Sequence, residues 1–182
     1  MITGKFPALR LRRSRKNDWS RRLVEENNLS PNDFILPIFL IDGKNKKQSI
    51  KSMPGVYRYT LDKVSIMIDK ALKEGLPMIA LFPYTDKKKK NITGSEALNC
   101  DNLVCKAIQL IKKKYKSEIG IMCDVALDPY TSHGHDGLLN KKYVLNDETV
   151  EMLIAQSLLQ AQMGCDVLAP SDMMDGRIGH IR

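Results

Sequence analysis

The chain has 182 residues, of which 43% are hydrophobic and 27% are charged, as is typical of a soluble globular protein with a real core. It holds no apolar run long enough to span a membrane, and its N-terminus turns basic at once instead of forming an apolar signal core. These features favour a cytoplasmic protein without a membrane partner. The four cysteines occur singly rather than in CxxC pairs, which argues against a zinc ribbon or a disulfide framework and favours reduced, mostly buried thiols.

The net charge of +8 is concentrated at the start of the chain. Residues 1–25 hold eight basic and two acidic side chains, a net of +6. We expect an extended basic arm over residues 1–30 that leads into a short helix at about 18–26, followed by a second domain over residues 31–182. The arm could bind nucleic acid through its charge or pack on a neighbouring subunit with Trp19 as an anchor. Because it lacks interleaved aromatic residues and a known nucleic-acid motif, the second reading is favoured.

The rest of the chain alternates between apolar strands and amphipathic helices. The predicted strands are 34–41, 78–82, 119–127 and 165–169, and the predicted helices are 60–75, 102–114, 146–164 and one that begins at 176. Thr60 and Asn146 are expected to cap their helices, and Gly75 suits a helix end. Pro37 is expected at a strand start or a bulge, because it has no N–H to donate. The four lysines at 87–90 are predicted to be solvated and mobile.

This alternation predicts a parallel sheet with right-handed crossovers. Two architectures fit, a doubly wound sheet and the first half of an eight-stranded barrel. No glycine-rich phosphate-binding pattern follows any strand, which disfavours a nucleotide-binding sheet. Polar residues follow several strands instead, as they do at the mouth of a barrel. We therefore expect the N-terminal half of an (α/β)8 TIM barrel.

The densest polar segment follows the third strand, within IGIMCDVALDPYTSHGHDGLL at 119–139. A buried strand that ends among acids, imidazoles and hydroxyls is typical of a catalytic face, and an ordinary polar surface loop is the alternative. The segment holds Asp124, Asp128, Asp136, His133, His135, Tyr130, Thr131 and Ser132.

Motifs along the whole chain resemble the porphobilinogen synthase, or 5-aminolevulinate dehydratase, family. They are RLRR at 10–13, DWSRRLVEEN at 18–27, SMPGVYR at 52–58, GSEA at 94–97, DVALDPYTSHGHDG at 124–137, ND-TV across 146–150 and APSDMMDGRIGHIR at 169–182. The resemblance implies a TIM barrel, an arm that embraces a neighbouring subunit in a homo-octamer, and no organic cofactor. It also implies a hydro-lyase that condenses two 5-aminolevulinate molecules to porphobilinogen in haem biosynthesis.

By this resemblance Asp124, Ser171 and Asp175 are candidate catalytic residues at the barrel mouth. Asp124 would orient or polarise groups near the substrate amine. For Ser171 and Asp175, capping of the last helix is the alternative.

The metal loop departs from the zinc-dependent members of the family. Their three cysteines correspond here to Ala126, Asp128 and Asp136. Alanine cannot coordinate a metal, and carboxylates suit Mg²⁺ rather than Zn²⁺. Asp128 and Asp136 are thus expected to bind either the metal or the substrate, and the His133–His135 pair is expected to shape the loop through hydrogen bonds.

A second departure concerns the nucleophiles. The family forms Schiff bases through two lysines that follow the SDMMDGR motif, and the sequence ends at Arg182 before either would occur. A Schiff-base lysine needs a buried site that lowers its pKa, and the lysines present lie in loops and on helix surfaces. We therefore expect the 182-residue chain to be inactive alone, as an open half-barrel with unpaired first and fourth strands. A truncated remnant that acts only as an assembly or regulatory subunit is the alternative.

Overall fold

A computed structural model describes residues 4–182; residues 1–3, at the start of the predicted arm, lie outside the described residues. The chain divides into two compact units, one that ends at Ser30 and one that spans Pro31–Arg182. No helix among residues 4–182 has the length and apolar character that crossing a bilayer requires.

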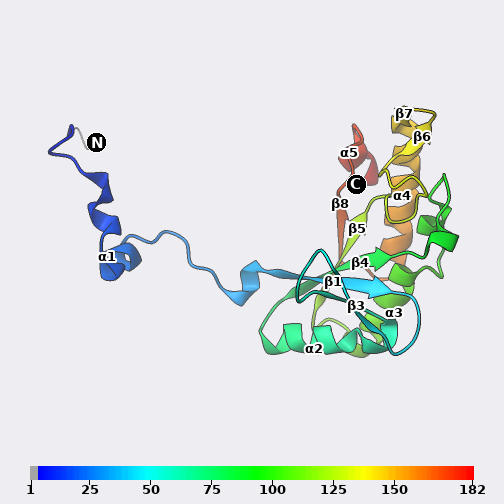
Figure 1. The fold of residues 1–182 in the computed structure, drawn as a ribbon, viewed down its shortest axis with the longest axis horizontal. Helices are drawn as coiled ribbons and strands as arrows, with labels where there is room; N and C mark the ends of the chain where they lie inside the picture. Colours follow the sequence, from blue (N-terminus) through cyan, green and yellow to red (C-terminus); the bar gives the residue numbers. More distant parts are fainter. Residues whose placement is uncertain (1–3) are drawn as a thin grey trace. The chain divides into compact units, whose positions relative to one another are not determined.

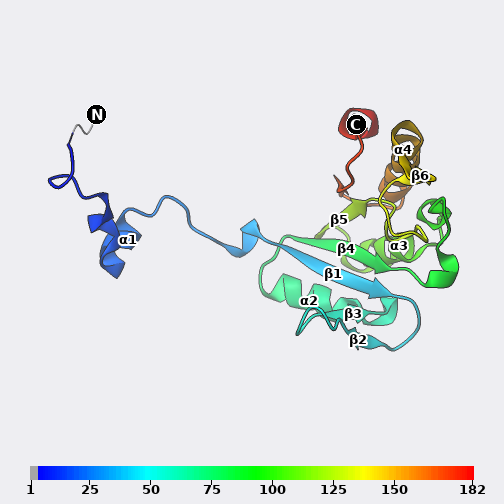
Figure 2. The same ribbon diagram turned by 45° about the horizontal axis from the view of Figure 1, so that its top comes forward.

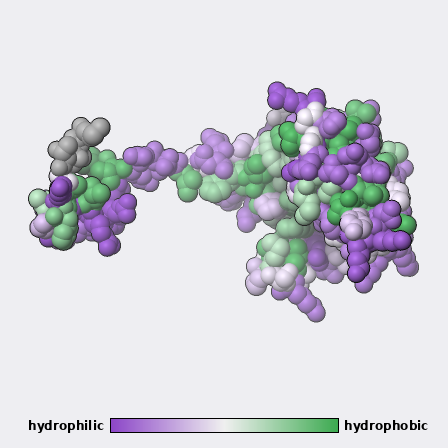
Figure 3. All heavy atoms as spheres, turned by 90° about the horizontal axis from the view of Figure 1, so that it is seen from above, coloured by the Kyte–Doolittle hydropathy of each residue, from purple (hydrophilic) through white to green (hydrophobic). Residues whose placement is uncertain are grey.

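The first unit contains two short helical segments. The 3-10 helix Leu11–Arg15 replaces the extended conformation expected there, and α1 (Asp18–Leu23) ends before the predicted limit of residue 26. The hydroxyl of Ser20 accepts a hydrogen bond of 3.3 Å from the Asn17 N–H at the start of α1. The largest apolar side chains of this unit are exposed, so green hydrophobic areas lie among purple hydrophilic ones in Figure 3.

The second unit is built on a six-stranded sheet in the order β2-β3-β1-β4-β5-β8 (Figures 1 and 2). Neighbouring strands are parallel, except that β2 runs antiparallel to β3. The strands are β1 (Ile35–Ile41), β2 (Lys47–Ser49), β3 (Tyr57–Tyr59), β4 (Met78–Tyr84), β5 (Gly120–Val125) and β8 (Val167–Pro170). The helices are α2 (Ser65–Lys73), α3 (Leu103–Tyr115), α4 (Asn146–Gln162) and α5 (Arg177–Ile181). A separate hairpin joins β6 (Leu138–Asn140) to β7 (Tyr143–Leu145).

Alternate side chains of the central strands lie on opposite faces of the sheet, as strand geometry requires. On one face Leu40, Ile79 and Ile121 are fully buried in a core with the apolar stripes of α2 and α3. On the opposite face Phe39 and Phe82 lie in contact, with ring centroids 5.6 Å apart. The predicted strand–helix alternation and parallel sheet are thus confirmed.

Three local predictions are wrong. The first strand is not an unpaired edge, because β3 pairs with its C-terminal part from Phe39 onward. The Thr60 hydroxyl bonds to the main chain of Lys46 instead of capping a helix. The Asn146 side chain accepts the N–H of Asp175 rather than capping α4. The position of Pro37 also differs from the prediction, because it lies inside the regularly paired strand β1 rather than at a strand start or a bulge. Its missing N–H is tolerated there because β3 pairs with β1 only from Phe39 onward.

Candidate functional site

The ends of β5 and β8 meet through two side chains. Parallel pairing places Asp124 of β5 opposite Ala169 of β8. Ser171 follows directly after the last residue of β8 and therefore lies close to Asp124. The Ser171 hydroxyl donates a hydrogen bond of 2.6 Å to the Asp124 carboxylate. Two residues that the sequence analysis selected are therefore brought together at the carboxyl ends of the strands.

Partial burial raises the pKa of Asp124 above its ordinary value, because a carboxylate loses hydration there. The hydrogen bond from Ser171 opposes this shift by stabilising the charged form, and the charge of Asp172 reinforces it. A carboxyl group with a raised pKa can both accept and release a proton closer to neutral pH.

The turn after β8 holds a buried carboxylate that the sequence analysis missed. The Asp172 side chain is fully buried, lies 3.1 Å from Nε of Arg177, and accepts the Met174 N–H at 2.7 Å. A carboxylate that accepts the N–H two residues ahead forms an Asx turn. An aspartate in the turn that follows a strand is the sequence signal that could have suggested it. This turn fixes the backbone directly after Ser171.

Asp175 is not brought to the Asp124–Ser171 pair by any side-chain contact found among residues 4–182. Its main chain is held by the side chain of Asn146, at the start of α4, whose Oδ1 accepts the Asp175 N–H and whose Nδ2 donates to the Asp175 carbonyl. Gly176, which has a positive φ of 79°, precedes α5 without a side-chain cap, so neither Ser171 nor Asp175 caps this helix.

Asp128 and Asp136 lie in the loop after β5. The Asp128 side chain is exposed, yet partial desolvation raises its pKa, and the nearby charges of Asp124 and Asp136 raise it further. Lys90 opposes this shift, and its ammonium group donates a hydrogen bond of 3.1 Å to the Asp128 carbonyl. The three aspartates therefore share one electrostatic environment, with Lys90 as its cation.

The two histidines shape the same loop, as predicted. Nδ1 of His133 accepts the N–H of His135 at 3.1 Å, so the ring proton belongs on Nε2, which faces the carbonyl of Ile92 at 3.3 Å. Nδ1 of His135 accepts the N–H of Gly137 at 2.9 Å and lies 3.0 Å from the Asp136 carboxylate.

Two lysines of the run at 87–90, which was predicted to be solvated and mobile, bind groups of neighbouring loops. Lys89 forms ion pairs with Asp42 at 2.9 Å and with Glu96 at 3.8 Å, while Lys90 binds the loop after β5. The loops after β1, β4 and β5 are thereby tied together. The end of β4 and the loops after β4 and β5 border a pocket of about 510 Å³, whose lining residues include Tyr84, Thr85, Lys87, Lys90, Thr131, Ser132, His133 and Gly134.

The donor set of the loop suits a hard cation. Among residues 4–182, no group of three or more His, Cys, Asp or Glu side chains is arranged to hold a metal ion. Mg²⁺ is commonly bound by one or two carboxylates and retains several water ligands, so Asp128 and Asp136 fit it chemically. Ala126 offers no ligand, and neither carboxylate is the thiolate that a zinc site of this kind would use.

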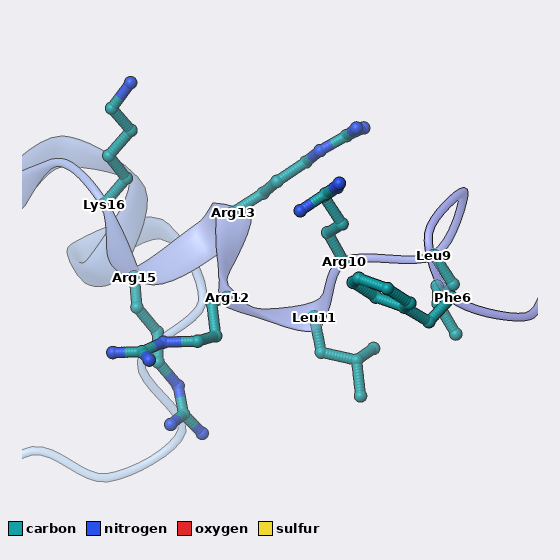
Figure 4. A pocket seen from close by; sticks show the side chains of 8 residues that line it. All are labelled: Phe6, Leu9, Arg10, Leu11, Arg12, Arg13, Arg15 and Lys16. Atoms are coloured by element: carbon teal, nitrogen blue, oxygen red, sulfur yellow. The ribbon is translucent and has the colours of Figure 1, made fainter.

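A second hollow, of about 660 Å³, lies wholly within the first unit (Figure 4). Its wall is strongly basic, and the Arg10 guanidinium lies 5.1 Å from the centre of the Phe6 ring. It shares no residue with the strand-end site.

Comparisons with known proteins agree with this architecture. The family model for delta-aminolevulinic acid dehydratase matches residues 8–182. A relative from Bradyrhizobium diazoefficiens named delta-aminolevulinic acid dehydratase is 56% identical over 96% of this chain and 49% of its own length. One of the same name from Rhodobacter capsulatus is 43% identical over 100% of this chain and 54% of its own length.

A crystal structure of delta-aminolevulinic acid dehydratase from Toxoplasma gondii ME49, in complex with the reaction product porphobilinogen, superposes with a TM-score of 0.88. It is 38% identical to this chain and is matched over 96% of this chain and 49% of its own. The parallel sheet thus corresponds to part of the TIM barrel of this family, and the chain spans about half the length of the curated relatives it matches. The chain belongs to the delta-aminolevulinic acid dehydratase family.

Proposed function

We propose that residues 1–182 act within a porphobilinogen synthase, which joins two 5-aminolevulinate molecules with loss of two water molecules. The remaining half would come from a continuation of the same polypeptide or from a second polypeptide. The observation that supports this most directly is the Asp124–Ser171 hydrogen bond at the carboxyl ends of β5 and β8, where TIM-barrel enzymes hold their substrates.

In this proposal the site handles the proton of a substrate amine. 5-Aminolevulinate carries an ammonium group, which must lose a proton before its nitrogen can form a new bond. The Asp124 carboxylate would attract the ammonium group and accept that proton, since its pKa is raised by burial. Ser171 would hold the carboxylate in position, and Asp175 would line the same mouth.

Asp128 and Asp136 would hold Mg²⁺ or contact the substrate amine. A bound Mg²⁺ would supply positive charge beside the three aspartates. Zn²⁺ is not expected to serve here, because Ala126 and the two carboxylates replace thiolates.

We further propose that the 182-residue chain alone forms no porphobilinogen, because the family's Schiff-base lysines lie beyond the motifs present. The arm would bind a second subunit in a homo-oligomer, an octamer by analogy with the family. In support, Phe6, Leu11 and Trp19 are 78%, 73% and 62% exposed, which is unusual for large apolar side chains without a partner.

The test is reconstitution. The chain is produced alone and together with the later half of the Bradyrhizobium diazoefficiens relative, and pyrrole formation from 5-aminolevulinate is measured. We call the second preparation the completed enzyme. We expect no product from the chain alone and product from the completed enzyme, with a loss of about a hundredfold or more for Asp124→Asn. A folded complex that forms no product would favour the assembly-subunit alternative.

A further inference from the structure

The backbone at the end of β5 lacks a hydrogen-bond donor that the sheet would normally supply. The Gly120 N–H donates to the Pro77 carbonyl, and the register runs from Met78↔Gly120 to Leu81↔Cys123. In a parallel ladder such hydrogen bonds recur every two residues along each strand. If the ladder continued, the Asp124 carbonyl would accept a hydrogen bond from the N–H of residue 83. Residue 83 is proline, which has no N–H, and the β4–β5 register ends before it.

Helix α4, which contacts β5 and β8 (Figure 1), supplies the missing donor from its side chains. Nε2 of Gln160 donates a hydrogen bond of 3.0 Å to the Asp124 carbonyl, and Nε2 of Gln156 donates one of 3.2 Å to the Ala126 carbonyl. Both glutamines are almost completely buried, at 3% and 1% exposure.

The spacing of the two partners matches. Four residues of helix rise by about 6.0 Å, and two residues of strand rise by about 6.6 Å. Side chains four apart on α4 can therefore reach carbonyls two apart on β5, which point in the same direction. The two glutamines thus donate to β5 the hydrogen bonds that a neighbouring strand would otherwise donate.

The orientation of both amides is determined by their partners. Because each Nε2 faces a carbonyl, flipping an amide would place two acceptor oxygens together. In the present orientation Oε1 of Gln156 and Oε1 of Gln160 are buried, and neither has a hydrogen-bond partner among residues 4–182. Leaving these two oxygens unsatisfied costs free energy. The favourable polar interactions of the two side chains are therefore the hydrogen bonds that they donate to the carbonyls of β5.

We infer that Gln160 and Gln156 are positioning residues, which hold the backbone of residues 124–126 so that the Asp124 carboxylate meets Ser171. This inference rests on the proposed function of Asp124. Neither glutamine touches the carboxylate itself, so the effect acts through the main chain.

The first test compares Gln160→Leu and Gln160→Glu in the completed enzyme. We expect kcat to fall about tenfold or more in Gln160→Leu, with KM within about twofold, because a small displacement of a reacting group lowers the rate strongly. An ionised glutamate cannot donate, whereas a protonated one can. Gln160→Glu should therefore regain activity relative to Gln160→Leu as the pH is lowered. Gln109→Leu is the matched control, because Gln109 is exposed on α3 and its amide donates a hydrogen bond of 3.1 Å to the Met163 sulfur, away from the carbonyls of β5.

The second test does not depend on activity. Hydrogen exchange followed by mass spectrometry should show faster exchange of residues 122–128 in Gln160→Leu, with the other segments unchanged, and no change in Gln109→Leu. Unchanged kcat, or faster exchange spread over the whole chain, would overturn the inference. If the unsubstituted completed enzyme forms no porphobilinogen, the proposed function fails, and the exchange pattern still decides whether Gln160 holds this segment.

Discussion

Ser171 and Asp124 lie 47 positions apart in the sequence and are joined by a hydrogen bond of 2.6 Å between the ends of adjacent parallel strands. The bond links the two long motifs by which the chain resembles its family. It also makes the protonation of Asp124 depend on Ser171, because the donated hydrogen bond stabilises the charged carboxylate.

Ser171→Ala should raise the pKa of Asp124 still further, because the lost hydrogen bond favours the charged form. In the completed enzyme, the acid limb of the kcat profile should move to higher pH, and kcat should fall about tenfold or more. Ser117→Ala, at an exposed residue between α3 and β5 and away from the carboxyl ends of the strands, is the control. An unchanged acid limb would mean that Asp124 does not set it.

Asp124 should also influence stability. Because its pKa is raised in the folded state, the folded protein binds this proton more tightly than the unfolded chain does. The contribution of Asp124 to the free energy of unfolding is therefore present below the ordinary pKa of Asp and is lost as the pH rises through the pKa of Asp124 in the folded protein. Asparagine cannot ionise, so the change in free energy of unfolding caused by Asp124→Asn should be more favourable at neutral pH than in acid. Urea unfolding of the completed enzyme with and without the substitution, at several pH values, measures this difference.

Arg177→Met should destabilise the completed enzyme by about 3 kcal/mol, because it leaves the fully buried carboxylate of Asp172 without its cation. Adding Asp172→Asn should recover much of this loss, since no buried charge remains. Both variants can be compared by denaturant unfolding. If the double variant is no more stable than the single one, the turn is not stabilised by this ion pair.

A zinc-selective chelator should leave the activity of the completed enzyme intact, because the loop offers carboxylates and an alanine in place of thiolates. A general chelator should lower the activity, and Mg²⁺ should restore it. Asp128→Asn combined with Asp136→Asn should abolish this response to Mg²⁺. A loss of activity that only zinc reverses would contradict the expected metal.

Two lysines of one run should differ in their effect on stability. Lys89→Met removes the ion pairs with Asp42 and Glu96 and should lower the free energy of unfolding by about 0.5–1 kcal/mol, since Lys89 is partly exposed. Lys88→Met serves as the control, because the Lys88 side chain forms no ion pair with any of residues 4–182. Raising the salt concentration should reduce the difference between the two.

Much of the architecture could be predicted from local patterns. Hydrophobic periodicity located β1, β4, β5, β8 and the helices that follow them, because strands and helices bury one face at periods of 2 and 3.6 residues. β3 was missed because a strand of three residues, two of which pair with the end of β1, leaves no periodic signal. The two predicted caps failed because Thr60 and Asn146 bond to residues distant in sequence.

The sequence by itself determined the order of strands and helices, the basic character of the arm, and the motifs that indicate the family. Only the tertiary structure decided which of its acids act together. Ser171 and Gln160 reach their partners because parallel register and helix packing place them there, and pairings between residues that far apart leave no trace in local sequence. Asp172 and Arg177 are only five residues apart, and it is the tertiary structure that buries the carboxylate of this ion pair completely.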